Sequence, residues 1–295
     1  MKFALNYSLP ALALWRETPT AFDLLKLPAW KALVDEVSPA HPAYIHFPLS
    51  VSNGSGVVLN SETKQPANFS QIESFMAQTA TPLVNIHLDP ALRQHPDLTP
   101  GDLSLSTQKE LIRRLIRDVS VLTEHFGAEK VIAENDPGSS RTVSAVLLPE
   151  VISAVIRETG CGLLLDLAHV QLAARALGLE PQDYLSRLPT DRIGEIHISG
   201  VQYLDLEWQA RLRAAGTLPE EKLARYREVW MDHVPLTSAD WAYLDWAAAQ
   251  IRGGAWQEPW VASCEYGGIG SFFAAALDET VIQEQIPRLG KLLRN

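Results

Sequence analysis

Short apolar runs alternate with longer amphipathic stretches along the whole chain. The runs are rich in β-branched and aliphatic residues, and seven of them are visible: Lys2–Asn6, Ala43–Phe47, Leu83–Leu88, Lys130–Ala133, Gly162–Leu167, Ile193–Ile198 and Trp260–Cys264. Runs of this length with little polar alternation are typical of strands that are buried on both faces, as in a parallel sheet. We predict a strand at each of them.

The stretches between the runs have helical spacing. The clearest helix is predicted to begin at Thr107, with Glu110 completing a capping box, and to end at Phe126, just before Gly127. The other predicted helices are Ala21–Val37, Ser70–Gln78, Thr142–Glu158, Glu221–Glu228, Ser238–Arg252 and Glu279–Leu292.

Strands that alternate with helices predict right-handed crossovers and a parallel sheet. A closed barrel needs an eighth strand, and the best candidate is the segment Val229–His233. The fold class is therefore α/β, a (β/α)8 TIM-type barrel formed as one domain over residues 1–295. The polar segment over residues 53–68 is the longest early loop, and we expect it to carry substrate contacts or a lid.

Composition narrows the functional classes. A formal net charge of −10 disfavours nucleic acid as a partner, because such proteins usually present a basic face. Two cysteines make no disulfide framework and fit a reducing, cytoplasmic setting. The first 15 residues lack the sustained apolar run of a signal peptide, and no stretch approaches the roughly 18 apolar residues that a membrane span requires.

Ionisable residues lie at the ends of the predicted strands. Seven strand ends carry one: His46, His87, Glu134, Asp166, His197, His233 and Glu265. His169 follows three residues after the Asp of its strand. Charged residues are rarely buried unless they are paired or bound to a metal, and in a barrel these strand ends converge on the face that carries active sites.

This donor set predicts a metal site. Imidazoles mixed with carboxylates favour iron, manganese or zinc. Eight candidate ligands exceed the four of a tetrahedral zinc site, so the set indicates two or more metals, or ligands together with acid–base groups. Asp89 and Asp136 are interpreted as turn residues, and Cys264 as a small core residue. No residue is assigned a catalytic role, and no glycine-rich motif predicts a nucleotide cofactor.

The order of the segments IHFPLSVSNGSG, VNIHLDP, IAENDP, LLLDLAHV, GEIHISG and DHVPL resembles the multinuclear non-haem iron-dependent oxidative enzymes (MNIO), a family within the xylose-isomerase-like barrels. The resemblance spans about residues 43 to 266. It implies two or three irons held by the seven strand-end residues and His169. It also implies oxidation, with dioxygen, of cysteines or neighbouring residues in ribosomally made peptides, often with a separate peptide-recognition partner protein.

The sequence departs from the family pattern at two places. Met231 stands where the family has an Asp, with Asp232 beside it, and Val201 stands where the family has a further His. The number of metals and the substrate, a precursor peptide or a small molecule, are therefore left open. The alternatives are a divalent-metal sugar isomerase or epimerase, an endonuclease of the same superfamily, and a non-catalytic metal-binding module.

Overall fold

The computed structural model describes residues 1–294, which form two compact units. The first unit contains Met1–Lys26 together with the chain from His197 onward, and the second contains Leu27–Ile196. The expectation of one domain over residues 1–295 stays a prediction.

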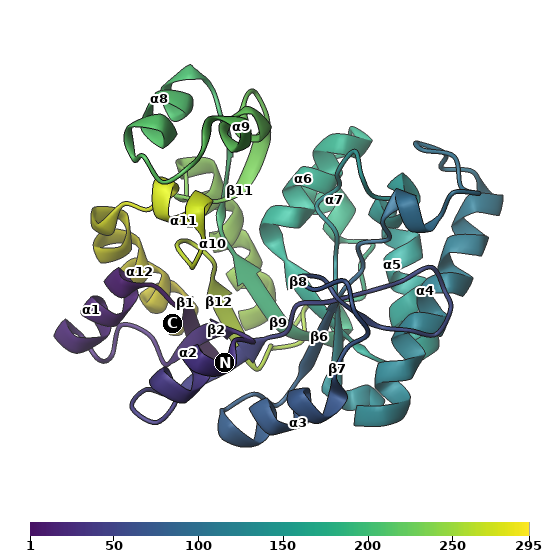
Figure 1. Cartoon of the computed structure of the whole chain (residues 1–295), viewed down its shortest axis with the longest axis horizontal. Coiled ribbons are helices and arrows are strands. Elements are labelled where there is room, and N and C mark those ends of the chain that lie inside the picture. The colour runs from purple at the N-terminus through teal and green to yellow at the C-terminus, as the bar shows by residue number, and fades with distance from the viewer. Residues whose placement is uncertain (295) are drawn as a thin grey trace. The chain divides into compact units, whose positions relative to one another are not determined.

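The second unit contains a mostly parallel sheet (Figure 1). Its strands are β3 (Ala43–His46), β4 (Leu49–Ser50), β5 (Leu59–Asn60), β6 (Val84–His87), β7 (Val131–Glu134), β8 (Gly162–Asp166) and the first four residues of β9 (Ile193–Ile198). Strand β6 pairs in parallel with β4 and β7, and β7 pairs in parallel with β8. The register places His87 beside Glu134. Two predicted site residues are thereby neighbours on adjacent strands.

Helices follow the strands of this unit. They are α2 (Lys31–Val37), α3 (Phe69–Gln78), α4 (Leu105–Phe126), α5 (Pro149–Thr159), α6 (Leu167–Leu177) and α7 (Pro181–Leu185), with 3-10 turns at Leu92–Gln94, Ala128–Lys130, Ser144–Leu147 and Thr190–Arg192. Helices α4 and α5 pack side by side (Figure 1). The predicted capping box at Thr107 is wrong, because α4 begins earlier and the Ser104 hydroxyl accepts the Thr107 N–H.

The first unit contains three strands of parallel sheet. Strand β1 (Lys2–Asn6) lies between β12 (Val261–Cys264) and β2 (Leu24–Pro28). The predicted helix over Ala21–Val37 is therefore wrong in its first half: Pro28 lacks the N–H that a helix interior needs, and the preceding residues pair with β1 as a strand. Only the second half, α2, is helical.

The prediction of an eighth barrel strand at Val229–His233 is also wrong. These residues begin β11 (Trp230–Val234), which pairs antiparallel with β10 (Gly200–Tyr203) in a separate two-stranded sheet. The close approach of the two strands requires glycine at position 200, because a Cβ there would meet the Pro235 carbonyl oxygen at 2.1 Å. The sequence prediction also lacks the strand β2 and the short strands β4, β5 and β10.

Helices complete the first unit. They are α1 (Leu9–Glu17), α8 (Leu206–Ala214), α9 (Glu220–Leu223) with the 3-10 turn Ala224–Tyr226, α10 (Ser238–Arg252), α11 (Ser271–Ala276) and α12 (Glu279–Arg294). Helix α1 packs against α12, and α8 against α11 (Figure 1). Helix α10 has the predicted bounds and a capping box between Thr237 and Asp240. Within residues 1–294, no helix combines the length and apolarity that crossing a membrane demands.

Candidate metal centre

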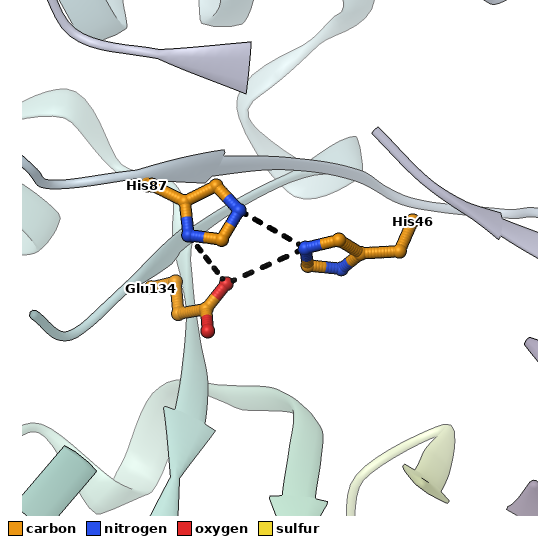
Figure 2. A group of neighbouring side chains, drawn as sticks. All are labelled: His46, His87 and Glu134. Atoms are coloured by element: carbon orange, nitrogen blue, oxygen red, sulfur yellow. Dashed lines mark hydrogen bonds and ion pairs between the residues drawn. The ribbon is translucent and has the colours of Figure 1, made fainter. Parts of the chain in front are cut away.

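Three predicted ligands meet at the strand ends of the second unit. His46, His87 and Glu134 are the last residues of β3, β6 and β7, and their side chains point toward one another (Figure 2). The Nε2 atoms of the two histidines are 3.0 Å apart. One Glu134 oxygen, Oε2, lies 3.1 Å from His87 Nδ1 and 3.7 Å from His46 Nε2. The carboxylate is buried and the histidines are partly exposed, so a substrate would reach this cluster from the histidine side.

The orientation of His46 is set by Asn85. The Asn85 amide accepts a hydrogen bond from Phe47 N–H at 2.7 Å and donates to the Phe47 carbonyl at 2.9 Å. These two contacts identify the oxygen and the nitrogen of the amide. Its Nδ2 also lies 3.2 Å from His46 Nε2. Since an amide nitrogen is a donor only, His46 Nε2 carries the lone pair.

That assignment creates a requirement for positive charge between the three side chains. A neutral His87 has one proton to share between Nε2, which faces the His46 lone pair, and Nδ1, which faces the Glu134 carboxylate. In either tautomer, two electron-pair donors face each other about 3 Å apart. A cation removes the conflict, either a second proton on His87 or a metal ion. Ligands about 2.1 Å from an ion and at right angles lie about 3 Å apart, so the donor set fits a metal.

Asp166 and His169 adjoin Glu134 from the next strand. His169 Nδ1 donates to the Asn135 carbonyl at 2.7 Å and lies 3.6 Å from Glu134 Oε1. Its Nε2, which then carries the lone pair, is 3.6 Å from Asp166 Oδ2. The other Asp166 oxygen, Oδ1, accepts the His169 N–H and caps α6. His169 thus faces Glu134 with its protonated Nδ1, and its lone pair on Nε2 is directed at Asp166.

Asn135 repeats the role of Asn85 one strand further along. Its amide accepts the Asp166 N–H at 2.9 Å and donates to the Asp166 carbonyl at 3.1 Å. Strand alternation predicts that Asn135 points away from the site unless the strand has ended, and β7 does end at Glu134. Each asparagine therefore replaces a strand-pairing interaction and holds the backbone next to a candidate ligand.

The two aspartates interpreted as turn residues are both close to the cluster. The Asp136 carboxyl accepts the Gly138 N–H at 2.7 Å, which is the expected turn contact, and the Asp89 carboxyl accepts the Ser50 hydroxyl at 2.6 Å. Burial raises the pKa of Asp136 to about 6, opposed by the nearby His169. Burial likewise raises the pKa of Asp89, opposed by His87.

The remaining three predicted ligands lie in the first unit, where Lys26 joins them. Lys26 Nζ lies 2.9 Å from His197 Nε2 and forms an ion pair with Glu265 Oε1. His197 Nδ1 is 3.3 Å from the same Glu265 oxygen. All three side chains are buried. The site prediction did not include Lys26, because β2 was interpreted as helix.

His233 reaches the same group from β11. Its Nδ1 donates to the Glu265 carbonyl at 3.1 Å, its N–H donates to Ser199 Oγ at 3.1 Å, and its ring meets Phe273 edge to face. The backbone of His233 has a φ of 57°, a left-handed conformation that costs about 1–3 kcal/mol for a residue other than glycine. Stored strain of this kind concentrates at functional sites.

Met231, which stands where the family has an Asp, and its neighbour Asp232 have different surroundings. Met231 packs against an apolar cluster that includes Leu204 and Phe272. Asp232 is buried, and its Oδ2 lies 3.7 Å from His233 Nε2. The carboxylate next to His233 is thus supplied by position 232, and position 231 contributes packing.

A buried aspartate anchors the loop that follows β4. Asp118, on the core face of α4, accepts the N–H groups of Ser52, Gly54 and Gly56 at 2.8–3.0 Å and the Ser52 hydroxyl at 2.9 Å. Its exposed fraction is 0%. Asp118 is a charged residue within the apolar stripe of α4, and this signal in the sequence is absent from the site prediction.

Comparisons with known proteins identify relatives of this chain. A family model described as "RiPP precursor modification enzyme MbnB/TglH/ChrH" matches residues 26–214. A UPF0276 protein of Anaeromyxobacter sp. (strain Fw109-5) is 31% identical over 151 residues, which are 47% of this chain and 51% of that protein. A UPF0276 protein of Caulobacter vibrioides (strain NA1000 / CB15N) is 34% identical over 108 residues, 36% of each chain. The matches therefore span about half or less of these relatives' lengths.

Among solved structures, a xylose isomerase domain protein from Alicyclobacillus acidocaldarius is 17% identical, with a TM-score of 0.52, and the match covers 100% of this chain and 98% of that chain. The likeness confirms the predicted fold, an α/β TIM-type barrel. The matched family model covers more than half of the chain, including β3 to β9 and the His46–His87–Glu134 cluster. The chain belongs to the MbnB/TglH/ChrH family of RiPP precursor modification enzymes, which are MNIO proteins.

Proposed function

We propose that this protein is a multinuclear non-haem iron oxidoreductase that modifies a precursor peptide. The observation that carries the proposal is the cluster of His46, His87 and Glu134, in which facing donor atoms require a cation. Two histidines and one carboxylate, with coordination positions left open, are the ligand set of non-haem Fe(II) oxygenases. The partial exposure of both histidines leaves room for a substrate.

More than one ion is proposed because a second pair of candidate ligands adjoins the first cluster. The lone pair of His169 Nε2 faces Asp166 Oδ2, and Asp166 and Glu134 offer oxygen atoms within 4.8 Å of one another. Five residues of the second unit would then hold two ions. The three predicted ligands of the first unit, His197, His233 and Glu265, are already engaged with one another or with Lys26.

An Fe(II) ion held by these residues would supply open coordination positions for dioxygen and for a substrate donor such as a thiolate, which is the usual chemistry of His/carboxylate iron sites. The protein's own groups prepare the site for it. The Asn85 amide identifies Nε2 as the His46 nitrogen with the lone pair, and the Asn135 carbonyl holds the His169 proton on Nδ1, which leaves the His169 lone pair on Nε2. Partners that fix a histidine's tautomer in this way raise metal affinity.

The substrate class comes from the family. Its members modify RiPP precursors, and we propose a peptide whose cysteine, or a residue beside it, is oxidised with dioxygen. We also propose a separate peptide-recognition partner and a cytoplasmic location, which the two buried free cysteines of this chain fit.

Elemental analysis tests the identity of the metal. Protein purified without oxygen is expected to contain close to two iron ions per chain, with Mössbauer spectra of high-spin Fe(II) that change on exposure to dioxygen. Stoichiometric zinc or manganese without iron would contradict the oxidative function and favour an isomerase or hydrolase.

Mass spectrometry tests the substrate class. A small cysteine-containing peptide encoded beside this gene, incubated with the iron-loaded protein and dioxygen, is expected to change in mass at or next to a cysteine. The matched control is the same peptide with that cysteine replaced by serine. An unchanged peptide mass, together with turnover of a sugar, would move the proposal to the epimerase class.

A further inference from the structure

Lys26 lies where a metal ion would be expected in the first unit. Its Nζ contacts Glu265 Oε1 and His197 Nε2, and the side chains of the three residues are at most 7% exposed. Both partners were predicted as metal ligands from the sequence. A buried lysine is rare unless it is paired, and here the carboxylate supplies the compensating charge.

The contact with Lys26 uses the donor atom that His197 would offer to a metal. A neutral imidazole has one lone pair, and an ammonium group only donates, so the lone pair of His197 is on Nε2 and is directed at Lys26 Nζ. The proton is then on Nδ1, 3.3 Å from Glu265 Oε1. The lone pair of His197 is therefore used by the ammonium group, and its protonated nitrogen faces the carboxylate.

The charge of Lys26 also disfavours a metal ion beside Glu265. The Lys26 ammonium group and a divalent ion would share the same Glu265 oxygen, and two cations a few ångströms apart inside a protein repel strongly. The carboxylate compensates one of them well. The donor set of this unit thus fits a resident ammonium group and not a metal ion beside it.

We propose that the Lys26 ammonium group is a built-in cation that takes the place of a metal ion between His197 and Glu265. The inference rests on the proposed function for its surroundings and sharpens it: the ions of this protein are held by the ligands of the second unit, and the residues of the first unit supply a fixed positive charge. Lys26 comes from β2 and Glu265 from the residue after β12, two strands that flank β1.

The experiment compares metal binding by wild-type protein and Lys26→Met. Co²⁺ is the probe, because its d–d absorption reports coordination and equilibrium dialysis gives the number bound. Methionine matches lysine as far as Cε and lacks the ammonium group, so this variant is expected to bind about one more Co²⁺ per chain. The gain should vanish in Lys26→Met/Glu265→Gln. Lys31→Met, which changes an exposed lysine paired with Asp35, is the matched control and should bind as wild type.

Glu265→Gln in the wild-type background keeps the test decisive if Lys26→Met does not fold. The proposal predicts that this variant retains the wild-type metal content, checked alongside its circular dichroism spectrum. Loss of one ion equivalent in folded Glu265→Gln, or no added ion in folded Lys26→Met, overturns the proposal. Wild-type protein that binds no iron would instead contradict the proposed function, and the added Co²⁺ in Lys26→Met would still be measurable.

Discussion

Removing the carboxylate of Asp118 is expected to destabilise the protein strongly, because four donors converge on it. The N–H groups of Ser52, Gly54 and Gly56 and the Ser52 hydroxyl lie 2.8–3.0 Å from its oxygens. In Asp118→Ala, the N–H groups of Ser52 and Gly54 remain buried without this acceptor, and each such orphan costs about 1–3 kcal/mol. Gly56 is partly exposed, so water replaces its lost partner.

The total for Asp118→Ala is therefore about 3–5 kcal/mol, since contributions within one network do not add in full. At about 2 °C for each kcal/mol in a chain of this size, Tm should fall by about 6–10 °C. Asp118→Asn keeps one acceptor oxygen and loses the charge, so we expect about half of that effect.

Urea unfolding followed by circular dichroism measures the free energy, and limited proteolysis over residues 52–68 reports whether the loop is released. Asp35→Ala is the matched control: this aspartate is exposed, pairs only with Lys31 among the interactions described, and should change stability by less than about 0.5 kcal/mol. The reasoning is refuted if Asp118→Ala unfolds within 1 kcal/mol of wild type, or if Asp35→Ala loses as much.

Three further predictions use other parts of the structure. Burial, followed by the Arg114 guanidinium group, lowers the pKa of His95 from 6.5, so the unfolded chain binds the proton more readily than the folded protein. The stability that His95 contributes is therefore fully present above about pH 6.5 and falls below it. His95→Gln should flatten the change in the urea midpoint between about pH 7.5 and 5.5. Asn135→Ala should weaken metal binding about 10- to 100-fold in a Co²⁺ titration while the circular dichroism spectrum is unchanged; unaltered affinity would remove its positioning role. Glu265→Gln leaves the Lys26 ammonium group buried without its carboxylate and should lower the free energy of unfolding by about 3–5 kcal/mol in urea. Lys26→Met/Glu265→Gln should recover most of this stability. A double variant no more stable than the single one would argue against the ion pair.

The alternating pattern predicted most of the framework, because buried parallel strands have long apolar runs and the helices between them have a clear apolar stripe. The predicted strand at β9 and the predicted helix at α10 agree with the structure at both ends. The segment over Ala21–Val37 failed for a specific reason: its apolar residues satisfy helical spacing as well as strand pairing. Pro28, inside the predicted helix, was the signal that a boundary lies there.

The site prediction names residues that are chemically conspicuous and omits those that act through geometry. Histidines and carboxylates at strand ends can be read from a sequence. Asn85 and Asn135 cannot, since their roles depend on the backbone of an adjacent strand that is 38 or 31 residues away. Lys26 was missed because the strand that carries it was missed.

The central claim is that Glu134 holds the metal ions together with the histidines on either side of it. Iron content per chain in anaerobically purified Glu134→Gln tests this directly, with Glu73→Gln, an exposed glutamate that pairs with His125, as the matched control. The account predicts that Glu134→Gln folds, by circular dichroism, and loses most of its iron, while Glu73→Gln keeps the wild-type content. Wild-type iron content in folded Glu134→Gln would contradict it.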